Sequence, residues 1–327
     1  MPQKTVIEAV HEAMLEEMRR DDRVFVMGED VANRGGVFLA TQDFLEEFGE
    51  ERVVDTPLAE AAIVGVAAGA AMNGMRPIAE IQFTDFIWPI VNQLVGEIAR
   101  TRYGSNGALG VPMVVRSPYG GGVRGGLYHS QSAEGFFAHC PGLKVVCPAT
   151  PYDAKGLLKS AIRDDDPVLF FEHKRSYRLV RGEVPDGEYT VPIGKADVKR
   201  TGTDMTLITY GLVLHHSLEA AEEVSREWIN VEVVDLRTVR PLDTETILES
   251  VRKTNRALIV HEDNLTGGIG AEVAAIIAQG AFDALDAPVT RLCGPDVPAM
   301  PFASNLEAMF LLDKDKIARA IRELAAY

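Results

Sequence analysis

The sequence predicts an α/β protein of two consecutive domains, each with a mainly parallel sheet covered by helices on both faces. Short apolar runs typical of buried strands alternate with longer stretches at helical spacing over most of the 327 residues. This alternation weakens once, in a stretch rich in Gly and Pro, and the length favours two domains over one. We therefore expect domains at 1–185 and 204–327, joined by a linker at 186–203.

The first half of the chain begins with a helix at Thr5–Arg20, where apolar residues recur at helical spacing. A buried strand, Arg23–Met27, follows and stops at Gly28. A later helix has a hydroxyl at its N-cap, Thr150, and a proline at its first position. The other strands expected here are Val53–Val54, Pro77–Gln82, Pro112–Arg116, Leu143–Cys147 and Pro167–Phe171. The other helices are Ala59–Asn73, Phe86–Tyr103 and Pro151–Arg163.

The second half repeats the alternation of strand and helix, after a candidate edge strand at Tyr189–Ile193. The strands expected here are Met205–Tyr210, Val231–Leu236, Ala257–His261 and Val289–Leu292. The helices expected between and after them are Leu212–Trp228, Thr244–Thr254, Gly270–Leu285 and Lys314–Ala326. Because helices alternate with strands, this half also predicts a parallel sheet.

The composition excludes several classes of function. The chain has 33 Lys and Arg against 48 Asp and Glu, a net charge of −15 without a basic cluster, which argues against nucleic acid as a partner. No apolar run reaches the roughly 18 residues of a membrane span, and no signal-like segment opens the chain, so we expect no membrane association. Three cysteines without Cys-x-x-Cys spacing predict neither a disulfide framework nor a zinc clip, as in a reducing cytoplasm.

A glycine-rich segment, Gly120–Gly125, matches the dinucleotide-binding pattern G-x-G-x-x-G and follows a predicted strand. A dinucleotide site requires such glycines to open a helix, with an acidic residue at the end of the next strand. Here further loop-like residues, Gly126 and Leu127, follow. We therefore predict a mobile loop, and an NAD-binding enzyme is a rival that binding of nicotinamide cofactor by this chain would support.

The helical segment Glu60–Ala70 carries two glycines four residues apart, Gly65 and Gly69, on one face. Small residues at this spacing let another backbone approach closely, and packing within one domain would explain them on their own. Glu60 adds a chemical feature, since it lies in the first helical turn among apolar neighbours. A carboxylic acid in such surroundings can share a proton with a nitrogen base.

This spacing of Glu60, Gly65 and Gly69 resembles the motif of the pyrimidine-binding domain of thiamine diphosphate enzymes. Further stretches, in the same order along the chain, resemble the beta subunit of 2-oxo acid dehydrogenases. They are Gly28–Val31, Arg34–Phe38, Asp55–Leu58, Arg76–Phe83, Tyr128–Ser132, His139–Lys144, Thr150–Leu157, Val234–Thr238 and Pro241–Asp243. The resemblance implies a transketolase-like pyrimidine-binding domain followed by a transketolase C-terminal-like domain.

The resemblance also implies roles for particular residues. Glu60 would contact the aminopyrimidine ring of thiamine diphosphate and activate the cofactor, and His129 would serve acyl transfer to a lipoyl group. An exposed turn acid and a core aromatic are the alternatives for two of the residues at family positions around the cofactor, Glu29 and Phe86. The full set implied to bind the cofactor is Glu29, Leu58, Glu60, Gln82 and Phe86.

Two metal ions follow from the same resemblance. Relatives bind potassium at positions matching Met113, Ala161, Asp164 and Asp166, although a solvated acidic turn is the alternative and asparagine is common at the last position. The Gly-Asp-Gly stretch that holds magnesium and the diphosphate in thiamine enzymes is absent. We therefore expect an alpha subunit to hold the magnesium and to share the cofactor, in a heterotetramer of two alpha and two beta chains.

The activity implied is that of a branched-chain 2-oxo acid dehydrogenase. It would decarboxylate 2-oxo acids such as 2-oxoisovalerate and acylate the lipoyl group of a dihydrolipoyl acyltransferase core. The branched-chain preference rests on resemblance in Thr84–Pro89, Gly125–Gln131 and Phe170–Arg175. Pyruvate and acetoin remain alternative substrates, because pockets separate methylenes by only about 1–3 kcal/mol. A noncatalytic interaction subunit is the rival from another class.

Overall fold

A computed structural model describes all of residues 1–327, which form two compact units. Unit 1 contains residues 1–119 and 137–193, and unit 2 contains residues 120–136 and 194–327. Each unit is an α/β domain with a mainly parallel sheet, which confirms the predicted fold class. The glycine-rich segment is interrupted from its neighbours in sequence, because its contacts group it with unit 2.

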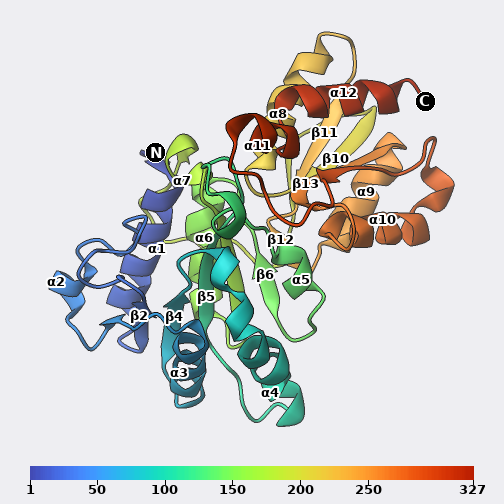
Figure 1. The fold of residues 1–327 in the computed structure, drawn as a ribbon. Helices are drawn as coiled ribbons and strands as arrows, with labels where there is room; N and C mark the ends of the chain where they lie inside the picture. The colour runs from blue at the N-terminus through green and yellow to red at the C-terminus, as the bar shows by residue number, and fades with distance from the viewer. The chain divides into compact units, whose positions relative to one another are not determined.

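The sheet of unit 1 contains six strands in the order β6-β7-β5-β4-β2-β3, and every neighbouring pair is parallel (Figure 1). Nearly all residues of these strands are buried, as expected for a sheet covered on both faces. The strands are β2 (Val24–Gly28), β3 (Val53–Asp55), β4 (Arg76–Glu80), β5 (Val114–Tyr119), β6 (Lys144–Val146) and β7 (Val168–His173). A short antiparallel pair consists of β1 (Gln3–Thr5) and β8 (Arg181–Glu183).

The helices of this half begin where the sequence offers caps. Thr5 and Glu8 form a reciprocal capping box at the start of α1, and Thr150 caps α6 through the backbone N–H of Asp153, as predicted. α1 packs against α6, and Figure 1 shows the two helices side by side. The helices are α1 (Val6–Arg20), α2 (Phe44–Phe48), α3 (Glu60–Met72), α4 (Ala99–Gly104), α5 (Glu134–Ala138), α6 (Pro151–Arg163) and α7 (Ser176–Leu179).

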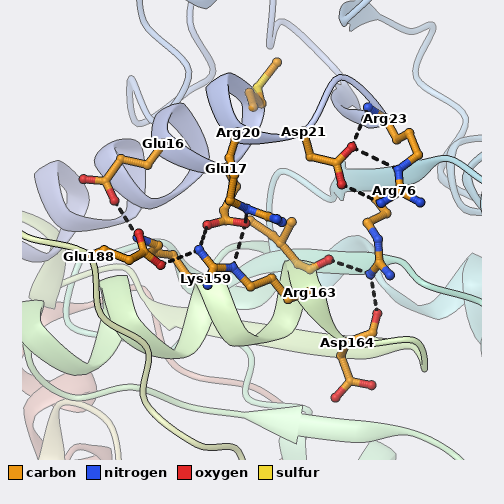
Figure 2. Close-up of polar contacts among 12 residues, drawn as sticks. Glu16, Glu17, Arg20, Asp21, Arg23, Arg76, Lys159, Arg163, Asp164 and Glu188 are labelled. Atoms are coloured by element: carbon orange, nitrogen blue, oxygen red, sulfur yellow. Dashed lines mark hydrogen bonds and ion pairs between the residues drawn. The ribbon is translucent and has the colours of Figure 1, made fainter.

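Ion pairs join α1 to α6 in a network that Figure 2 shows. The buried carboxylate of Glu17 accepts hydrogen bonds from Arg163, and the ammonium of Lys159 contacts Glu16 at 2.7 Å and Glu188 at 2.5 Å. Hydrogen bonds to Glu17 hold the pKa of Arg163 above its usual range. The network satisfies charges that the packing of the two helices removes from water.

The sheet of unit 2 contains five strands in the order β14-β13-β10-β11-β9, of which only β9 runs antiparallel to its neighbour. The strands are β9 (Asp197–Arg200), β10 (Met205–Thr209), β11 (Val231–Asp235), β13 (Ala257–Asn264) and β14 (Thr290–Gly294), with the short β12 (Thr238–Arg240) after β11. The helices are α8 (Val213–Ser225), α9 (Thr244–Thr254), α10 (Ile269–Gly280), α11 (Ser304–Phe310) and α12 (Lys314–Ala325).

Two predicted elements are wrong. The continuous helix expected at Phe86–Tyr103 is instead two 3₁₀ turns, a π-helix over Asn92–Ile98 and the short α4. Pro89 lies in the second turn and lacks the N–H that a continuous helix would use. The edge strand expected at Tyr189–Ile193 is absent, because the N–H of Val191 donates to the Gly156 carbonyl of α6 at 3.1 Å.

No helix has the length and apolar character needed to cross a bilayer. All three cysteines carry free thiols, as expected from their spacing.

Candidate functional site

The carboxyl ends of three adjacent strands in unit 1 lie level with one another. Gly28, the last residue of β2, pairs with Asp55 at the end of β3 and with Glu80 at the end of β4. In parallel α/β sheets the residues that follow such strand ends form the usual ligand site. Glu29 follows β2, and Glu60 begins the helix after β3, so the topology brings both predicted carboxylates to this edge.

Glu29 and Glu60 are half-buried, and neither carboxylate accepts a hydrogen bond or forms an ion pair within the chain. Burial raises the pKa of Glu29, and the nearby carboxylate of Glu60 adds to the rise. Glu60 has no capping role towards the preceding residue, since the N-cap of α3 is Ala59. Two half-buried carboxylates without partners are suited to bind a ligand that brings hydrogen-bond donors.

The other predicted cofactor residues surround this edge. The side-chain amide of Gln82 donates a long hydrogen bond, 3.4 Å, to the backbone carbonyl of Glu29. Phe86 is partly exposed in a 3₁₀ turn after β4, with its ring centroid 6.0 Å from that of Phe83. Leu58 is 79% exposed, so its side chain is available to a bound molecule or a partner chain. Glu29, Gln82 and Phe86 therefore lie on consecutive sides of the same strand ends.

A buried ionic cluster lies directly behind the site. Arg116 donates two hydrogen bonds to Glu172, at 2.6 and 2.7 Å, and one to Glu80 at 2.7 Å. Tyr177 donates to the same carboxylate of Glu172 at 2.5 Å. One cation thus faces two carboxylates, and burial raises the pKa of Glu80 even though Arg116 opposes the rise. A Cβ at Gly36 would lie 3.3 Å from the Glu80 carboxylate, so the loop after β2 packs against this cluster.

One face of α3 lacks partners in this chain. A Cβ added at Gly65 or Gly69 would meet no atom within 4 Å, and Val66 and Met72 are 60% and 42% exposed. Packing inside one domain therefore does not explain the two glycines. The open face is suited to a second backbone from another chain.

His129 lies in unit 2, whereas the other predicted catalytic and cofactor residues lie in unit 1. It is half-buried and follows a 3₁₀ turn at Gly126–Tyr128. The glycines before it open no α-helix, so the context of a dinucleotide-binding motif is absent, as predicted.

The four residues predicted to bind potassium lie near the opposite, amino-terminal ends of β5 and β7. The carbonyls of Met113 and Ala161 accept hydrogen bonds from backbone N–H groups, at 3.0 and 3.3 Å. Lys144 donates to both oxygens of Asp164, at 2.6 and 2.7 Å, and Arg102 forms an ion pair with Asp166. The oxygen donors are of the right kind for an alkali cation, but cationic side chains already hold the carboxylates, so the site does not fit potassium as it stands.

A pocket of about 600 Å³ also opens at these amino-terminal ends, away from the carboxylates. Its lining is mostly apolar and includes Arg102, Gly142 and Asp166. Its size fits a small-molecule site. We nevertheless place the candidate active site at the opposite edge, because the side chains able to move protons lie there.

Sequence reasoning missed the cluster of Glu80, Arg116 and Glu172. A signal was present, since Glu80 and Arg116 are charged residues inside predicted buried strands. Charged groups at such positions are nearly always paired. Their spacing of 36 residues gave no indication that they pair with each other.

The fold and the carboxylate site together define a protein of the transketolase type. Two family models match the chain: "Transketolase, pyrimidine binding domain" over residues 3–180 and "Transketolase, C-terminal domain" over residues 194–317. A solved structure titled "Split gene transketolase, inactive beta4 tetramer" matches with a TM-score of 0.79, covering 99% of this chain and 98% of that one. Its identity is 23%, so this likeness concerns the fold alone.

Closer relatives narrow the assignment. The 2-oxoisovalerate dehydrogenase subunit beta of Bacillus subtilis is 61% identical over 321 residues, 98% of each chain. The pyruvate dehydrogenase E1 component subunit beta of the same organism is 50% identical over the full length of both chains. The chain belongs to the family of 2-oxo acid dehydrogenase beta subunits.

Proposed function

We propose that this chain is the beta subunit of a branched-chain 2-oxo acid dehydrogenase, that is, a 2-oxoisovalerate (3-methyl-2-oxobutanoate) dehydrogenase. The pair of half-buried, unpartnered carboxylates at the strand ends, Glu29 and Glu60, is the observation that carries the catalytic part of this proposal. The 61% identity with a 2-oxoisovalerate dehydrogenase subunit beta supports the substrate class.

Thiamine diphosphate is the cofactor that these residues would hold, and when bound it supplies the electron sink for loss of carbon dioxide from a 2-oxo acid. The carboxylate of Glu60 would accept a hydrogen bond from a protonated ring nitrogen. The raised pKa of Glu29 suits a group that shares a proton close to this carboxylate. Gln82 offers both a donor and an acceptor to an amino group, and Leu58 and Phe86 would bound the ring with apolar surface.

His129 would act in the second half of the reaction, the transfer of the acyl group to a lipoyl group of a dihydrolipoyl acyltransferase. An imidazole exchanges protons near neutral pH, as this transfer requires. The histidine also lies in a loop rather than in a packed core, where it is open to a second substrate.

An alpha subunit is the partner that the chain requires for activity. The sequence has no Gly-Asp-Gly stretch to hold a diphosphate through magnesium, so the alpha subunit would supply both. The open α3 face with Gly65 and Gly69 supports close packing against another chain. We infer a heterotetramer of two alpha and two beta chains in the cytoplasm, associated with an acyltransferase core.

The test of the cofactor role is Glu60→Gln in the reconstituted alpha–beta complex. We expect decarboxylation of 2-oxoisovalerate to fall by about 100-fold or more, because general acid–base catalysis contributes about 10²–10⁴-fold. Size-exclusion chromatography should show unchanged assembly, and Glu46→Gln on the exposed side of α2 is the matched control. Full activity of the Glu60 variant would favour the rival, a noncatalytic interaction subunit.

The branched-chain preference is tested by kcat/KM of the same complex on 2-oxoisovalerate, pyruvate and acetoin. We expect the highest value with 2-oxoisovalerate, with modest ratios because each methylene is worth about 1–3 kcal/mol. A higher value with pyruvate or acetoin would reassign the substrate, without affecting the proposed cofactor role.

Potassium at the acidic turn stays a proposal, and we assign it no catalytic step. The ammonium of Lys144 would compete with the ion for Asp164, since it contacts both carboxylate oxygens. Lys144→Met should therefore give a larger difference in Tm between potassium and sodium buffers than the parent chain. An equal difference in both proteins, at matched ionic strength, would contradict potassium binding here.

A further inference from the structure

Helix α11 buries a single side chain, and that side chain is a carboxylate. Glu307 is 5% exposed, whereas the apolar residues beside it on the helix, Leu306 and Met309, are 46% and 72% exposed. A surface helix ordinarily buries its apolar residues, because a buried charge is unfavourable unless hydrogen bonds satisfy it. The burial of Glu307 must therefore be explained by the hydrogen bonds that it accepts.

Those hydrogen bonds come from the glycine-rich loop that precedes His129. One carboxylate oxygen of Glu307 accepts the backbone N–H of Gly122 at 3.0 Å and that of Arg124 at 3.1 Å. A second carboxylate, Glu262 near the end of β13, is 6% exposed and accepts the N–H of Gly121 at 2.6 Å. Two buried carboxylates of unit 2 thus hold three backbone N–H groups of one short loop.

The loop adopts a conformation that needs such support. Its φ angles are positive at Gly120, Gly122 and Gly126, and also at Arg124, where φ is 57°. A residue with a Cβ enters this region only at a cost, and glycines lose much backbone entropy when they are ordered. Hydrogen bonds to a charged acceptor are stronger than neutral ones, so they can offset both costs.

The position of the loop is coupled to that of His129 by close packing. A Cβ at Gly125 would lie 2.5 Å from the carbonyl oxygen of His129 and 2.7 Å from its Cβ. On the other side, a Cβ at Gly126 would lie 3.2 Å from the ring of Phe302, just before α11. The loop therefore fills the space between the backbone of His129 and the segment that carries Glu307.

We propose that Glu262 and Glu307 are positioning residues, whose carboxylates hold the loop 120–126 and through it place His129 for acyl transfer. This inference rests on the proposed function of His129. It assigns to the C-terminal domain a part in the reaction, since both carboxylates come from that domain. The partial reactions should separate, because decarboxylation does not use His129 and acyl transfer does.

The test uses Glu307→Ala and Glu307→Gln in the reconstituted alpha–beta complex. Decarboxylation is measured with dichlorophenolindophenol as oxidant, and reductive acylation is measured with an isolated lipoyl domain. We expect kcat/KM for the lipoyl domain to fall about tenfold or more in Glu307→Ala, because two charge-assisted hydrogen bonds are lost. Decarboxylation should stay within about twofold of the parent, and Glu307→Gln should recover most of the loss since its amide oxygen can still accept.

Hydrogen exchange gives a readout independent of activity. Amides of the peptide covering 120–130 should exchange faster in both Glu307 variants than in the parent, with the larger increase in Glu307→Ala. Glu249→Ala, on the exposed side of α9, is the matched control and should leave this peptide unchanged. If Glu307→Ala does not assemble, the exchange and acylation rates of Glu307→Gln decide alone.

Three results would overturn the inference: equal loss of both partial reactions, no loss of either, or unchanged exchange in the loop. His129→Asn separates this failure from failure of the proposed function. Acylation that survives His129→Asn removes the proposed role of the histidine itself. Acylation that is lost in His129→Asn but intact in Glu307→Ala removes only the positioning role.

Discussion

Replacing Arg116 with methionine should unfold unit 1 more easily, by about 3–5 kcal/mol at pH 7. The guanidinium is 1% exposed and donates three hydrogen bonds, two to Glu172 and one to Glu80, which are themselves 0% and 4% exposed. Methionine fills much of the same volume but leaves both carboxylates buried without a cation. Removal of one partner from a buried ion pair is strongly destabilising for this reason.

The magnitude is bounded by protonation of the carboxylates. At pH 7, binding a proton costs a carboxyl group of ordinary pKa about 4 kcal/mol, which is less than leaving it charged and unpaired in the interior. Glu80 adds little, because burial already raises its pKa in the parent protein. The main cost therefore falls on Glu172, which agrees with a loss of about 3–5 kcal/mol.

The pH dependence follows with a definite sign. In the variant, the folded state holds protons on these carboxyl groups at pH values where the unfolded chain has released them. Stability of Arg116→Met should therefore rise, relative to the parent, as the pH falls from 7 towards 5, by up to about 1.4 kcal/mol per pH unit for each group concerned. Glu80→Gln is the matched control and should change stability by less than about 1 kcal/mol, since a neutral acceptor still faces Arg116.

Urea unfolding followed by tryptophan fluorescence measures these changes. The chain has two tryptophans, Trp88 in unit 1 and Trp228 in unit 2, so a Trp228→Phe background lets Trp88 report on unit 1. Should Arg116→Met lose less than about 1 kcal/mol, or lose the same at pH 5 and pH 7, the account of a buried, charge-paired cluster would be refuted.

Glycine and histidine substitutions test other parts of the fold. Gly142→Ala should destabilise unit 1 well beyond Gly74→Ala, because φ is 98° and 96° but only the Cβ at 142 would strike a carbonyl oxygen, that of Ala99 at 1.9 Å. Equal shifts of the urea midpoint would contradict this. In unit 2, burial lowers the pKa of His261 to about 4, so the unfolded chain binds a proton that the folded chain does not. Its contribution should therefore fall by about 3 kcal/mol between pH 6.5 and 4, a loss seen as the difference from His261→Gln, whose amide can still accept the Gly270 N–H. A constant difference across this range would show that His261 is not held neutral.

Local periodicity predicted the order and type of most elements. The helix α9 spans Thr244–Thr254, as predicted, because its apolar spacing and its Asp243 cap both lie within a few residues of each other. The same local information failed between Phe86 and Tyr103, where apolar spacing is shared by α, 3₁₀ and π geometries. There the packing around Pro89 selected the geometry.

The sequence by itself determined the two α/β domains, the family and the chemical candidates Glu29, Glu60 and His129, since each depends on short-range patterns. Only the tertiary structure decided which charges meet. The carboxylates of Glu262 and Glu307 reach the loop before His129 across 141 and 185 residues of chain. The physical reason is that such contacts depend on how strands and helices pack in three dimensions, and no pattern along the chain records which distant residues this packing brings together.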